Sequence, residues 1–516
     1  MAKALWNISM GNLLSTMAQR YPAKIAVIEG AGKRRRCRFK ELNEKVNMLS
    51  HGLMQMGLKK GDFVSILLHN CLEFVEVYNA LAKVGGVASP LVYRLAPHEL
   101  TLLINNCDAT TLIFGSEFTP IVDEIKQRLK SVKHYVCIGE GAPSWAIPYE
   151  DLSKGQAVTE PDVEICDDDP FYLNYTSGTT GLPKAVVLNH YNNVIAAVST
   201  FNNPYDIVSQ DVILCGFPLY GRIGMGMMSA AIIQGARQVI MDFEPKACLE
   251  AIEVERVTFL MFAPIMSYMM LQVLEKQDYD LTTIRGLSSV GAPITKPIYE
   301  GIVRKITPNV YDYSGTQETA SNYVALPHMK RVNYATLGTP NLFTKVRIID
   351  DQGNDVPPGQ EGEIITKTAQ GPLEYFKDPQ RTKGEIKEGW FYVRDVGHFD
   401  EHGWIYLTGR TKDMIKTGGQ QVMAPEVEEI LMAHPAVADC AIVGVPDEVW
   451  GEAVTAIVVP KEGTSATEEE LIKFCRDKMA HFKAPKMVKF ITEIPRTPTG
   501  KVQKFVLVNQ YSRKQE

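Results

Sequence analysis

The sequence has no two cysteines in CxxC spacing, although nine cysteines are scattered along its 516 residues. This scatter argues against a structural zinc site, whose ligands usually occur as closely spaced pairs. A chain of this length can bury a large core without covalent cross-links. We therefore expect neither structural zinc nor a disulfide framework.

Long uncharged hydrophobic runs are also missing. The most apolar stretch, residues 257–274, is interrupted by Pro264 and three polar side chains, which excludes a membrane span. A buried strand followed by a helix that begins at the proline explains this stretch better. No unbroken apolar segment follows Met1–Asn7, so we predict no signal peptide and a cytoplasmic location.

There is no excess of basic residues. Lysine and arginine total 54 and acidic residues total 60, which gives a net charge of −6. Nucleic-acid-binding proteins are usually strongly basic, so we expect no nucleic-acid partner. The chain is 45% hydrophobic and 22% charged, which is typical of a globular protein and excludes a disordered or collagen-like chain.

Short apolar runs alternate with helical patterns through most of the chain. Residues 63–68 predict a strand covered on both faces, residues 72–83 a helix, and residues 87–91 a second strand. This alternation predicts parallel sheets wrapped by helices. Further strands of the same kind are expected at residues 110–114, 135–138, 238–241 and 258–262.

The pattern changes after about Asn333. Short strands separated by turns then predict a distorted antiparallel barrel or a small antiparallel domain; they are residues 346–350, 362–366, 390–393 and 403–407. Beyond Arg410, a compact α+β pattern of about 100 residues predicts a small separate domain. Its elements are helices at 425–433 and 467–479 and strands at 437–443, 453–459 and 487–491.

The predicted fold class is therefore α/β. A large N-terminal domain, residues 1–410, combines two βα-wrapped sheets with the distorted antiparallel barrel. A small mobile α+β domain, residues 411–516, follows it. We place the boundary at Gly409–Asp413, between the antiparallel region and the first helix of the tail.

The most informative segment is a loop rich in glycine and threonine at residues 175–184, with the sequence YTSGTTGLPK. Its hydroxyls and inward-turned backbone N–H groups can bind phosphate oxygens, and Lys184 adds a positive charge. Ala185 stands where a Walker A loop has the hydroxyl that binds Mg²⁺. The loop therefore argues against a kinase-like or GTPase-like NTPase.

This loop resembles the signature of the adenylate-forming superfamily, which includes acyl-CoA synthetases, luciferases and peptide-synthetase adenylation domains. The resemblance covers nearly the whole chain. Five further segments match family motifs in family order: the adenine-binding loop, the YGxTE segment, the segment ending in a ribose-binding aspartate, the interdomain hinge and the catalytic-lysine loop. They are residues 289–294, 315–319, 389–397, 409–413 and 495–501.

The resemblance implies an acid:CoA ligase that uses ATP, CoA and Mg²⁺. A carboxylate and ATP give an acyl-adenylate and pyrophosphate, and the CoA thiol then gives a thioester and AMP. Two anions must meet in the first step, so the site needs positive charge between them. The resemblance implies that Lys501, in the loop at 495–504, bridges the carboxylate and the α-phosphate, that Lys184 holds the outer phosphates, and that Glu318 and Thr176 hold the metal.

The resemblance also implies the other nucleotide-binding positions and the parts of the CoA site. Asp395 would accept hydrogen bonds from the ribose hydroxyls, and Arg410 would donate to the ribose or a phosphate. Lys412 would be the hinge, and Gly418 and Gly419 would line the CoA channel. The remaining ATP-binding positions are Thr176, Ser177, Gly178, Thr179, Thr180, Gly181, Gly291, Ala292, Pro293, Thr316 and Gln317.

The chain departs from the family pattern at two motifs. Where the family commonly has PLxHxxG, Gly221 replaces the histidine, which puts the gating role of that histidine in doubt. In YGxTE, Ser314 replaces the tyrosine and Gln317 the threonine. Tyr313, one position earlier, could supply the missing ring, and the Gln317 amide can still donate to and accept from a ligand.

Substrate identity is only partly visible in the sequence. The candidate acyl-pocket residues are Tyr220, Gly224, Met225, Val290, Tyr313 and Ser314. We expect the glycines to leave volume and the aromatics to suit a flat or alicyclic body, which favours a medium-size monocarboxylic acid that is cyclic, aromatic or short-chain aliphatic. An ordinary helix core is equally compatible with the methionines of residues 225–228.

Arg222 could attract a second carboxylate or the CoA phosphates, but a surface position is favoured for it. The alternative function is a stand-alone adenylation enzyme that loads a carrier-protein thiol, although no aspartate near residues 220–226 is present to hold an amino-acid ammonium. The expected partners are the carboxylic acid, ATP and CoA, without integral membrane association, and a homodimer is left open.

Overall fold

The computed structural model describes residues 7–30, 35–176, 184–372, 374–410, 414–417, 420–447, 449–496 and 502–512. The chain divides into two compact units. The first comprises Met1–Lys345 and Lys367–Phe391, and the second comprises Val346–Thr366 and Tyr392–Glu516.

A seven-stranded sheet in the first unit carries the strand that leads into the predicted phosphate-binding loop. All neighbouring strands in it are parallel except the last two, which form an antiparallel hairpin. Its central strands are buried at nearly every position, as expected for a sheet covered on both faces. The spatial order is β7 (Ile147–Pro148), β6 (His134–Ile138), β5 (Thr111–Gly115), β3 (Phe63–Leu67), β4 (Val87–Pro90), β8 (Pro170–Thr176) and β9 (Lys184–Asn189).

A nine-stranded sheet in the same unit carries most of the other candidate residues. It is parallel in its centre and antiparallel at both edges. The spatial order is β16 (Thr339–Pro340), β15 (Ala320–Ala325), β14 (Val310–Thr316), β13 (Gly286–Val290), β12 (Phe259–Phe262), β10 (Val212–Cys215), β11 (Arg237–Ile240), β1 (Ile25–Glu29) and β2 (Arg36–Arg38).

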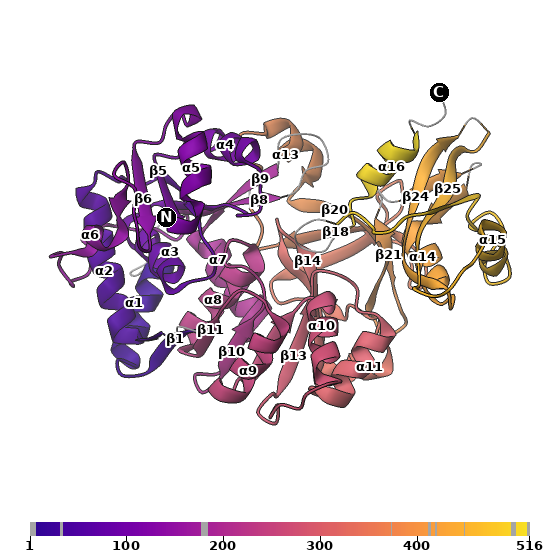
Figure 1. Ribbon diagram of the computed structural model, residues 1–516, viewed down its shortest axis with the longest axis horizontal. Helices are drawn as coiled ribbons and strands as arrows, with labels where there is room; N and C mark the ends of the chain where they lie inside the picture. The colour runs from indigo at the N-terminus through magenta and orange to yellow at the C-terminus, as the bar shows by residue number, and fades with distance from the viewer. Residues whose placement is uncertain are drawn as a thin grey trace. The chain divides into compact units, whose positions relative to one another are not determined.

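Helices pack against both sheets of this unit. α9, α10 and α11 stand side by side along the nine-stranded sheet (Figure 1), and each has a proline in its first turn, where the fixed φ suits a helix start. The helices are α1 (Met10–Arg20), α2 (Phe39–Gln55), α3 (Leu72–Val84), α4 (Pro97–Asn106), α5 (Thr119–Ile125), α6 (Tyr149–Ser153), α7 (His190–Ala196), α8 (Arg222–Gln234), α9 (Pro245–Glu255), α10 (Pro264–Leu274), α11 (Lys296–Lys305), α12 (Pro327–Val332) and α13 (Pro379–Glu385).

One hydrophobic core joins the two large sheets. Side chains of α1, α2, α3 and α8 pack in it between strands of both sheets. Each fully buried aliphatic side chain stabilises the folded state by about 1.5–3 kcal/mol relative to exposure. Representative members are Leu14, Val46, Ile66, Val75, Met228 and Ile240.

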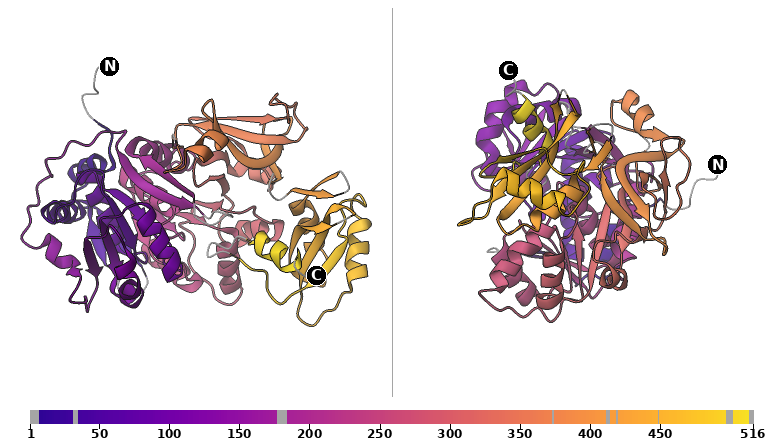
Figure 2. Two further views of the ribbon diagram at one scale, coloured as in Figure 1. Left: turned by 90° about the horizontal axis from the view of Figure 1, so that it is seen from above. Right: turned by 90° about the vertical axis from the view of Figure 1, so that its right-hand side faces the viewer.

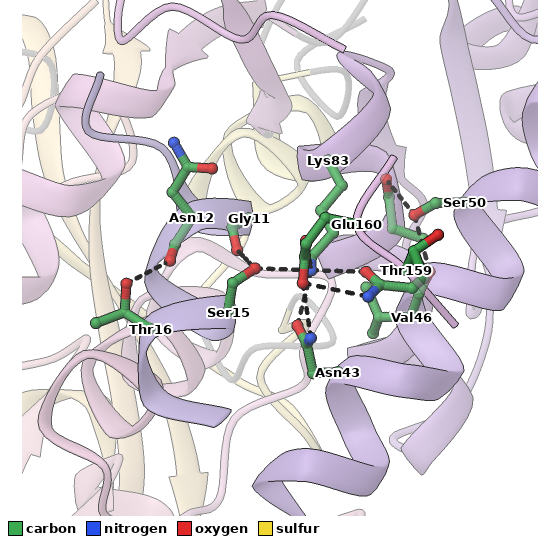
Figure 3. A network of polar contacts seen from close by, with 12 residues as sticks. Gly11, Asn12, Ser15, Thr16, Asn43, Val46, Ser50, Lys83, Thr159 and Glu160 are labelled. Carbon is green, nitrogen blue, oxygen red and sulfur yellow. Dashed lines mark hydrogen bonds and ion pairs between the residues drawn. The ribbon is translucent and has the colours of Figure 1, made fainter. Parts of the chain in front are cut away.

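A buried lysine fixes the chain that leads into β8. The Lys83 side chain on α3 is only 3% exposed. Its ammonium donates to Ser15 Oγ (2.9 Å) and to the side-chain oxygens of Asn43 and Asn47 (both 2.7 Å), and it pairs with Glu160 (Figure 3). Glu160 lies in the segment that connects α6 to β8. The network therefore ties that segment to three helices.

A five-stranded sheet follows along the chain. Its order is β17 (Thr344–Ile349), β18 (Gly362–Thr368), β20 (Trp390–Phe399) and β19 (Ile386–Lys387), with β21 (Ile405–Arg410) paired to β20. The β20–β21 and β19–β20 pairs are antiparallel.

The C-terminal part of the second unit is an α+β sandwich (Figures 1 and 2). Alternate residues of its strand β24 (Val437–Asp447) point to opposite faces: Cys440 and Ile442 pack in one hydrophobic cluster, and Ala441 and Val443 pack in another. The first cluster contains residues of α14 (Ala424–Met432) and α15 (Glu468–Arg476), and the second contains Leu507 of α16 (Lys504–Ser512). The other strands are β22 (Met414–Thr417), β23 (Gln420–Met423), β25 (Gly451–Pro460) and β26 (Met487–Phe490).

These elements confirm the predicted α/β fold class and the predicted strands and helices, with ends that differ by a few residues. The boundary at Gly409–Asp413 and the mobility of the small domain stay predictions. In the part of the chain that the structure describes, no helix combines the length and apolarity needed to cross a bilayer.

We predict that Lys83→Ala lowers the thermal unfolding midpoint by about 5 °C or more, because it removes the cation at the centre of the network and leaves the buried Asn47 side-chain oxygen without this donor. Differential scanning calorimetry measures this. Lys40→Ala is the control, since Lys40 lies in an exposed pair with Glu44 (3.8 Å) whose loss costs little. Equal midpoints for the two variants would contradict a stabilising role for the network.

Candidate active site

The β8–β9 hairpin closes the predicted phosphate-binding loop. Thr176, at the end of β8, is the register partner of Lys184, at the start of β9. The predicted positions within the loop lie outside the described residues: Ser177, Gly178, Thr179, Thr180 and Gly181. The side chain of Thr176 also lies outside them. The antiparallel ladder therefore fixes the position from which the Lys184 side chain starts.

Lys184 forms an ion pair that the sequence did not indicate. Its ammonium donates to Glu385 Oε1 (2.9 Å) and Oε2 (3.3 Å). Glu385 is the last residue of α13, and Tyr375 Oη donates to its Oε2 over 2.6 Å. Burial acts to raise the pKa of the Glu385 carboxyl, but the Tyr375 hydroxyl and the Lys184 ammonium outweigh burial, so that its pKa is lowered. Glu385 is thus an anion beside the predicted phosphate-binding lysine.

Tyr375 is held against the outer edge of β9. It forms an antiparallel bridge with Val186, and the Phe376 N–H donates to Ala185 O (2.8 Å). The Tyr375 side chain is buried, and burial raises its pKa well above the usual range. Its hydroxyl therefore stays protonated at neutral pH. The same hydroxyl lies 3.4 Å from Glu318 Oε1.

The predicted metal-binding segment is the turn between β14 and β15. Thr316 Oγ1 accepts a hydrogen bond from the Thr319 N–H (3.1 Å), which fixes the turn that presents Glu318. Gln317, the residue that departs from the family motif, accepts a hydrogen bond at its Oε1 from Asn174 Nδ2 of β8 (3.1 Å). The seven-stranded sheet and the nine-stranded sheet therefore meet at this turn.

The expectation for Arg222 is wrong, because its side chain is buried rather than on the surface. The guanidinium donates to the main-chain oxygens of Gln317 and Glu318 (both 3.2 Å) and of Gln370 (2.6 Å). Burial lowers its pKa to about 10, so it stays charged at neutral pH. A cation inside an apolar helix end must be paired, and here main-chain carbonyls of the candidate site supply the partners.

Glu318 fits a magnesium site. Mg²⁺ in nucleotide enzymes is usually held by one or two carboxylates together with substrate phosphates. Among the described residues no cluster of three or more metal-ligating side chains occurs. Glu318 is half-buried, its main-chain oxygen accepts a hydrogen bond from Arg222, and its carboxylate has the chemistry of such a ligand.

The candidate acyl-pocket residues divide between two packed regions. Tyr220 lies edge to face with Tyr93 (ring centroids 5.6 Å apart), and Met225 is buried beside it in the core between the sheets. Val290 and Tyr313 are buried in a second cluster that contains Phe201, and the Tyr313 and Phe201 rings are 5.8 Å apart. Ser314, which replaces the tyrosine of the motif, is half-buried at the end of β14.

The glycines of α8 do not leave volume, contrary to the expectation. A Cβ at Gly224 would lie 2.3 Å from Pro218 O, and a Cβ at Gly226 would lie 2.4 Å from the Phe201 ring. These glycines allow close packing instead. Gly221, in place of the family histidine, is different, since a Cβ there would meet its nearest neighbour at an ordinary 3.5 Å.

The predicted adenine-binding residues lie in the loop from β13 to α11. Gly291, Ala292 and Pro293 are all exposed there. In the second unit, Asp395 on β20 is buried and is the register partner of Arg410 on β21. The antiparallel pairing therefore places the two predicted ribose-binding positions opposite each other, while the Arg410 side chain lies outside the described part.

Several predicted positions cannot be placed. Lys412, Gly418, Gly419 and Lys501 lie outside the described residues, so their roles stay predictions.

Tyr375, Glu385 and Asn174 were missed by the sequence analysis. They lie 57–201 residues from the predicted site residues that they contact, and no local pattern marks them. Arg222 had a usable signal, namely a cation next to the apolar run 223–232, which requires buried partners.

Comparisons with known proteins agree with these features. A family model described as AMP-binding enzyme matches residues 14–376, and a model of the AMP-binding enzyme C-terminal domain matches residues 426–501. The long-chain-fatty-acid–CoA ligase FadD13 of Mycobacterium tuberculosis is 31% identical, over 92% of this chain and 93% of its own length. The feruloyl-CoA synthase of Amycolatopsis is 32% identical, over 90% of this chain and 92% of its own length.

A solved structure shows the same similarity across the whole fold. The o-succinylbenzoate CoA synthetase MenE of Bacillus subtilis, in complex with its acyl-adenylate intermediate, matches with a TM-score of 0.85. It is 27% identical and covers 96% of this chain and 97% of its own.

The two glycines at the start of α8 give a matched test of the site. Gly224→Ala forces a methyl group into contact with Pro218 O, so we expect a loss of activity of about tenfold or more and a lower unfolding midpoint. Gly221→Ala has room for its methyl group and should keep the activity and the unfolding midpoint unchanged. Steady-state kinetics and thermal unfolding measure the difference, and two variants of equal activity would refute the packing argument.

Proposed function

This chain belongs to the AMP-binding enzyme family and is an ATP-dependent acyl-CoA ligase, and from this premise we propose that its acid is a medium-size monocarboxylic acid, cyclic, aromatic or short-chain aliphatic. The family, the fold class and the enzyme class predicted from the motifs are thereby confirmed. The relatives include proteins named for fatty acids and for aromatic acids, so the substrate has to be argued from the residues.

Tight aromatic packing around the candidate acyl pocket is the observation that carries this proposal. Phe201 occupies the space beside Gly226 and lies against Tyr313. Phe201 belongs to a π-helical segment, Ala197–Asn202, an element that often marks functional sites. Aromatic side chains close to one another favour a flat or alicyclic acyl group over a long flexible chain.

In the first step a carboxylate oxygen attacks the α-phosphorus of ATP. A new P–O bond forms, the bond from the α-phosphorus to the bridging oxygen breaks, and pyrophosphate leaves. We propose that Lys501 stabilises the negative charge that builds between the carboxylate and the α-phosphate. Lys184 would bind the outer phosphates. Positioning and charge stabilisation suffice, without a covalent protein nucleophile.

The other proposed roles are supported by the resemblance to the family. Glu318 would hold Mg²⁺, together with Thr176, and the ion would neutralise phosphate charge when bound. Asp395 and Arg410 would hold the ribose, and the 291–293 loop would hold the adenine.

In the second step the CoA sulfur attacks the acyl carbon. The C–O bond to the phosphate breaks, the thioester forms and AMP leaves. We propose that the small domain turns about Lys412 between the two steps, because Lys501 is needed only in the first and the thiol needs an open path in the second. Gly418 and Gly419 would line that path.

The substrate proposal predicts a clear ranking of acids. With ATP and CoA in excess, kcat/KM for benzoate, cyclohexanecarboxylate or butyrate should exceed that for palmitate by about tenfold or more, because the packing of Phe201 against Tyr313 and Gly226 leaves little room for a long chain. AMP and thioester are measured together for each acid. A palmitate value equal to the best of the three would overturn the proposal.

A second prediction concerns the catalytic lysine. Lys501→Ala should lower the rate of adenylation by roughly two orders of magnitude or more, the scale of one lost transition-state charge partner. Thioester formation from preformed acyl-adenylate should change much less. Pyrophosphate exchange and single-turnover thioester assays separate the two steps.

Lys504→Ala is the matched control, since Lys504 lies three residues after Lys501, at the start of α16, and its ammonium pairs with Glu428 (2.7 Å). It should keep both rates. Equal losses in both half-reactions for Lys501→Ala would contradict the assigned role.

A further inference from the structure

The ion pair between Lys184 and Glu385 has no role in the two proposed steps, adenylation and thioester formation. Both side chains are partly buried, with 28% and 22% of their surface exposed. Both carboxylate oxygens lie within 3.3 Å of the ammonium. The lysine assigned to the ATP phosphates therefore already has an anionic partner from its own chain.

We propose that the Glu385 carboxylate competes with the ATP phosphates for Lys184 and thereby sets the ATP concentration that adenylation requires. The inference rests on the proposed role of Lys184 as a phosphate-binding residue. An ammonium that gives its protons to a carboxylate must release at least some of them before it can bind a phosphate oxygen. The free energy of the ion pair is then subtracted from the free energy of ATP binding.

Glu385 is held in place for this competition. The Tyr375 hydroxyl donates to it, and Tyr375 is itself anchored by its bridge to Val186 and by Thr382 Oγ1, which accepts a hydrogen bond from its N–H (2.9 Å). A carboxylate fixed in this way loses little conformational entropy when it pairs with the lysine. The pair is therefore stronger than one between two freely moving surface side chains.

The surrounding charges point to the same conclusion. Arg381 is the other nearby cation, with its guanidinium carbon 5.9 Å from the Tyr375 ring centroid. Its Nε, however, donates to Asp378 Oδ2 (3.1 Å). Glu318, whose Oε1 lies 3.4 Å from the Tyr375 hydroxyl, adds a second negative charge. The cation whose ammonium the Glu385 carboxylate occupies is therefore Lys184.

The test is Glu385→Gln, which removes the charge and keeps the shape of the side chain and one acceptor oxygen. We expect the KM for ATP in pyrophosphate exchange, and the Kd for Mg·ATP titrated without acid, to fall by about threefold to tenfold. Damage to the fold would weaken binding, so a gain in affinity cannot come from misfolding. Glu385→Ala should change both constants in the same direction.

Asp108→Asn is the matched control. Asp108 pairs with Lys377 (2.7 Å) in the same unit, and Lys377 is two residues after Tyr375 in the sequence. The φ of Asp108 also has to suit the replacement residue. Asp108 has a positive φ of 52°, which asparagine tolerates. This variant removes one carboxylate from a lysine pair without touching Lys184, and it should leave the KM and Kd for ATP unchanged. If Asp108→Asn lowered the KM and Kd for ATP as much as Glu385→Gln, the effect would come from the net charge of the protein, and the proposal would be overturned.

The Lys184→Ala background separates this inference from the function on which it rests. If Lys184 binds the phosphates and Glu385 acts through it, Lys184→Ala raises the KM for ATP, and adding Glu385→Gln then brings little further gain. If Lys184→Ala leaves the KM unchanged, the role of Lys184 fails. If Lys184→Ala raises the KM but Glu385→Gln alone raises it or leaves it unchanged, the competition fails and the role of Lys184 stands.

Discussion

The buried guanidinium of Arg222 is the constraint on which the candidate site depends. A charge removed from water must find hydrogen-bond acceptors, and Arg222 finds them in main-chain oxygens of Gln317, Glu318 and Gln370. The start of α8, the turn after β14 and the segment after β18 are thereby joined at one point. Main-chain acceptors leave the Glu318 carboxylate available for other partners. One buried cation thus fixes the position of an acidic residue without neutralising it.

The parts that were predictable from the sequence are those set by local pattern. The strand at 63–67 and the helix at 72–84 follow from the spacing of apolar residues, and the proline at 264 marks the start of a helix. The motif at 315–319 was recognised as a short contiguous segment that resembles the YGxTE segment of the family. In each case the physical cause lies within about twenty residues, so the sequence contains it.

The parts that were not predictable depend on pairs that are distant in sequence. Glu385 meets Lys184 across 201 residues and Asn174 meets Gln317 across 143, and only the packing of α13 and of the two large sheets brings them together. The glycines of α8 were misjudged for the same reason. A missing side chain creates a space only if nothing else fills it, and Pro218 and Phe201 fill these two positions.

The bridge between Val186 and Tyr375 has a consequence for the solubility of the protein. β9 is the last strand of its sheet, and an open strand edge is a template on which other chains can add strands and aggregate. The Tyr375–Phe376 segment covers part of that edge with its own main chain. The same short segment carries the hydroxyl that contacts Glu318 and Glu385. A substitution that shifts this segment to change the site would therefore also uncover the strand edge. Protection against aggregation and placement of the Tyr375 hydroxyl thus both require this segment to stay paired with β9.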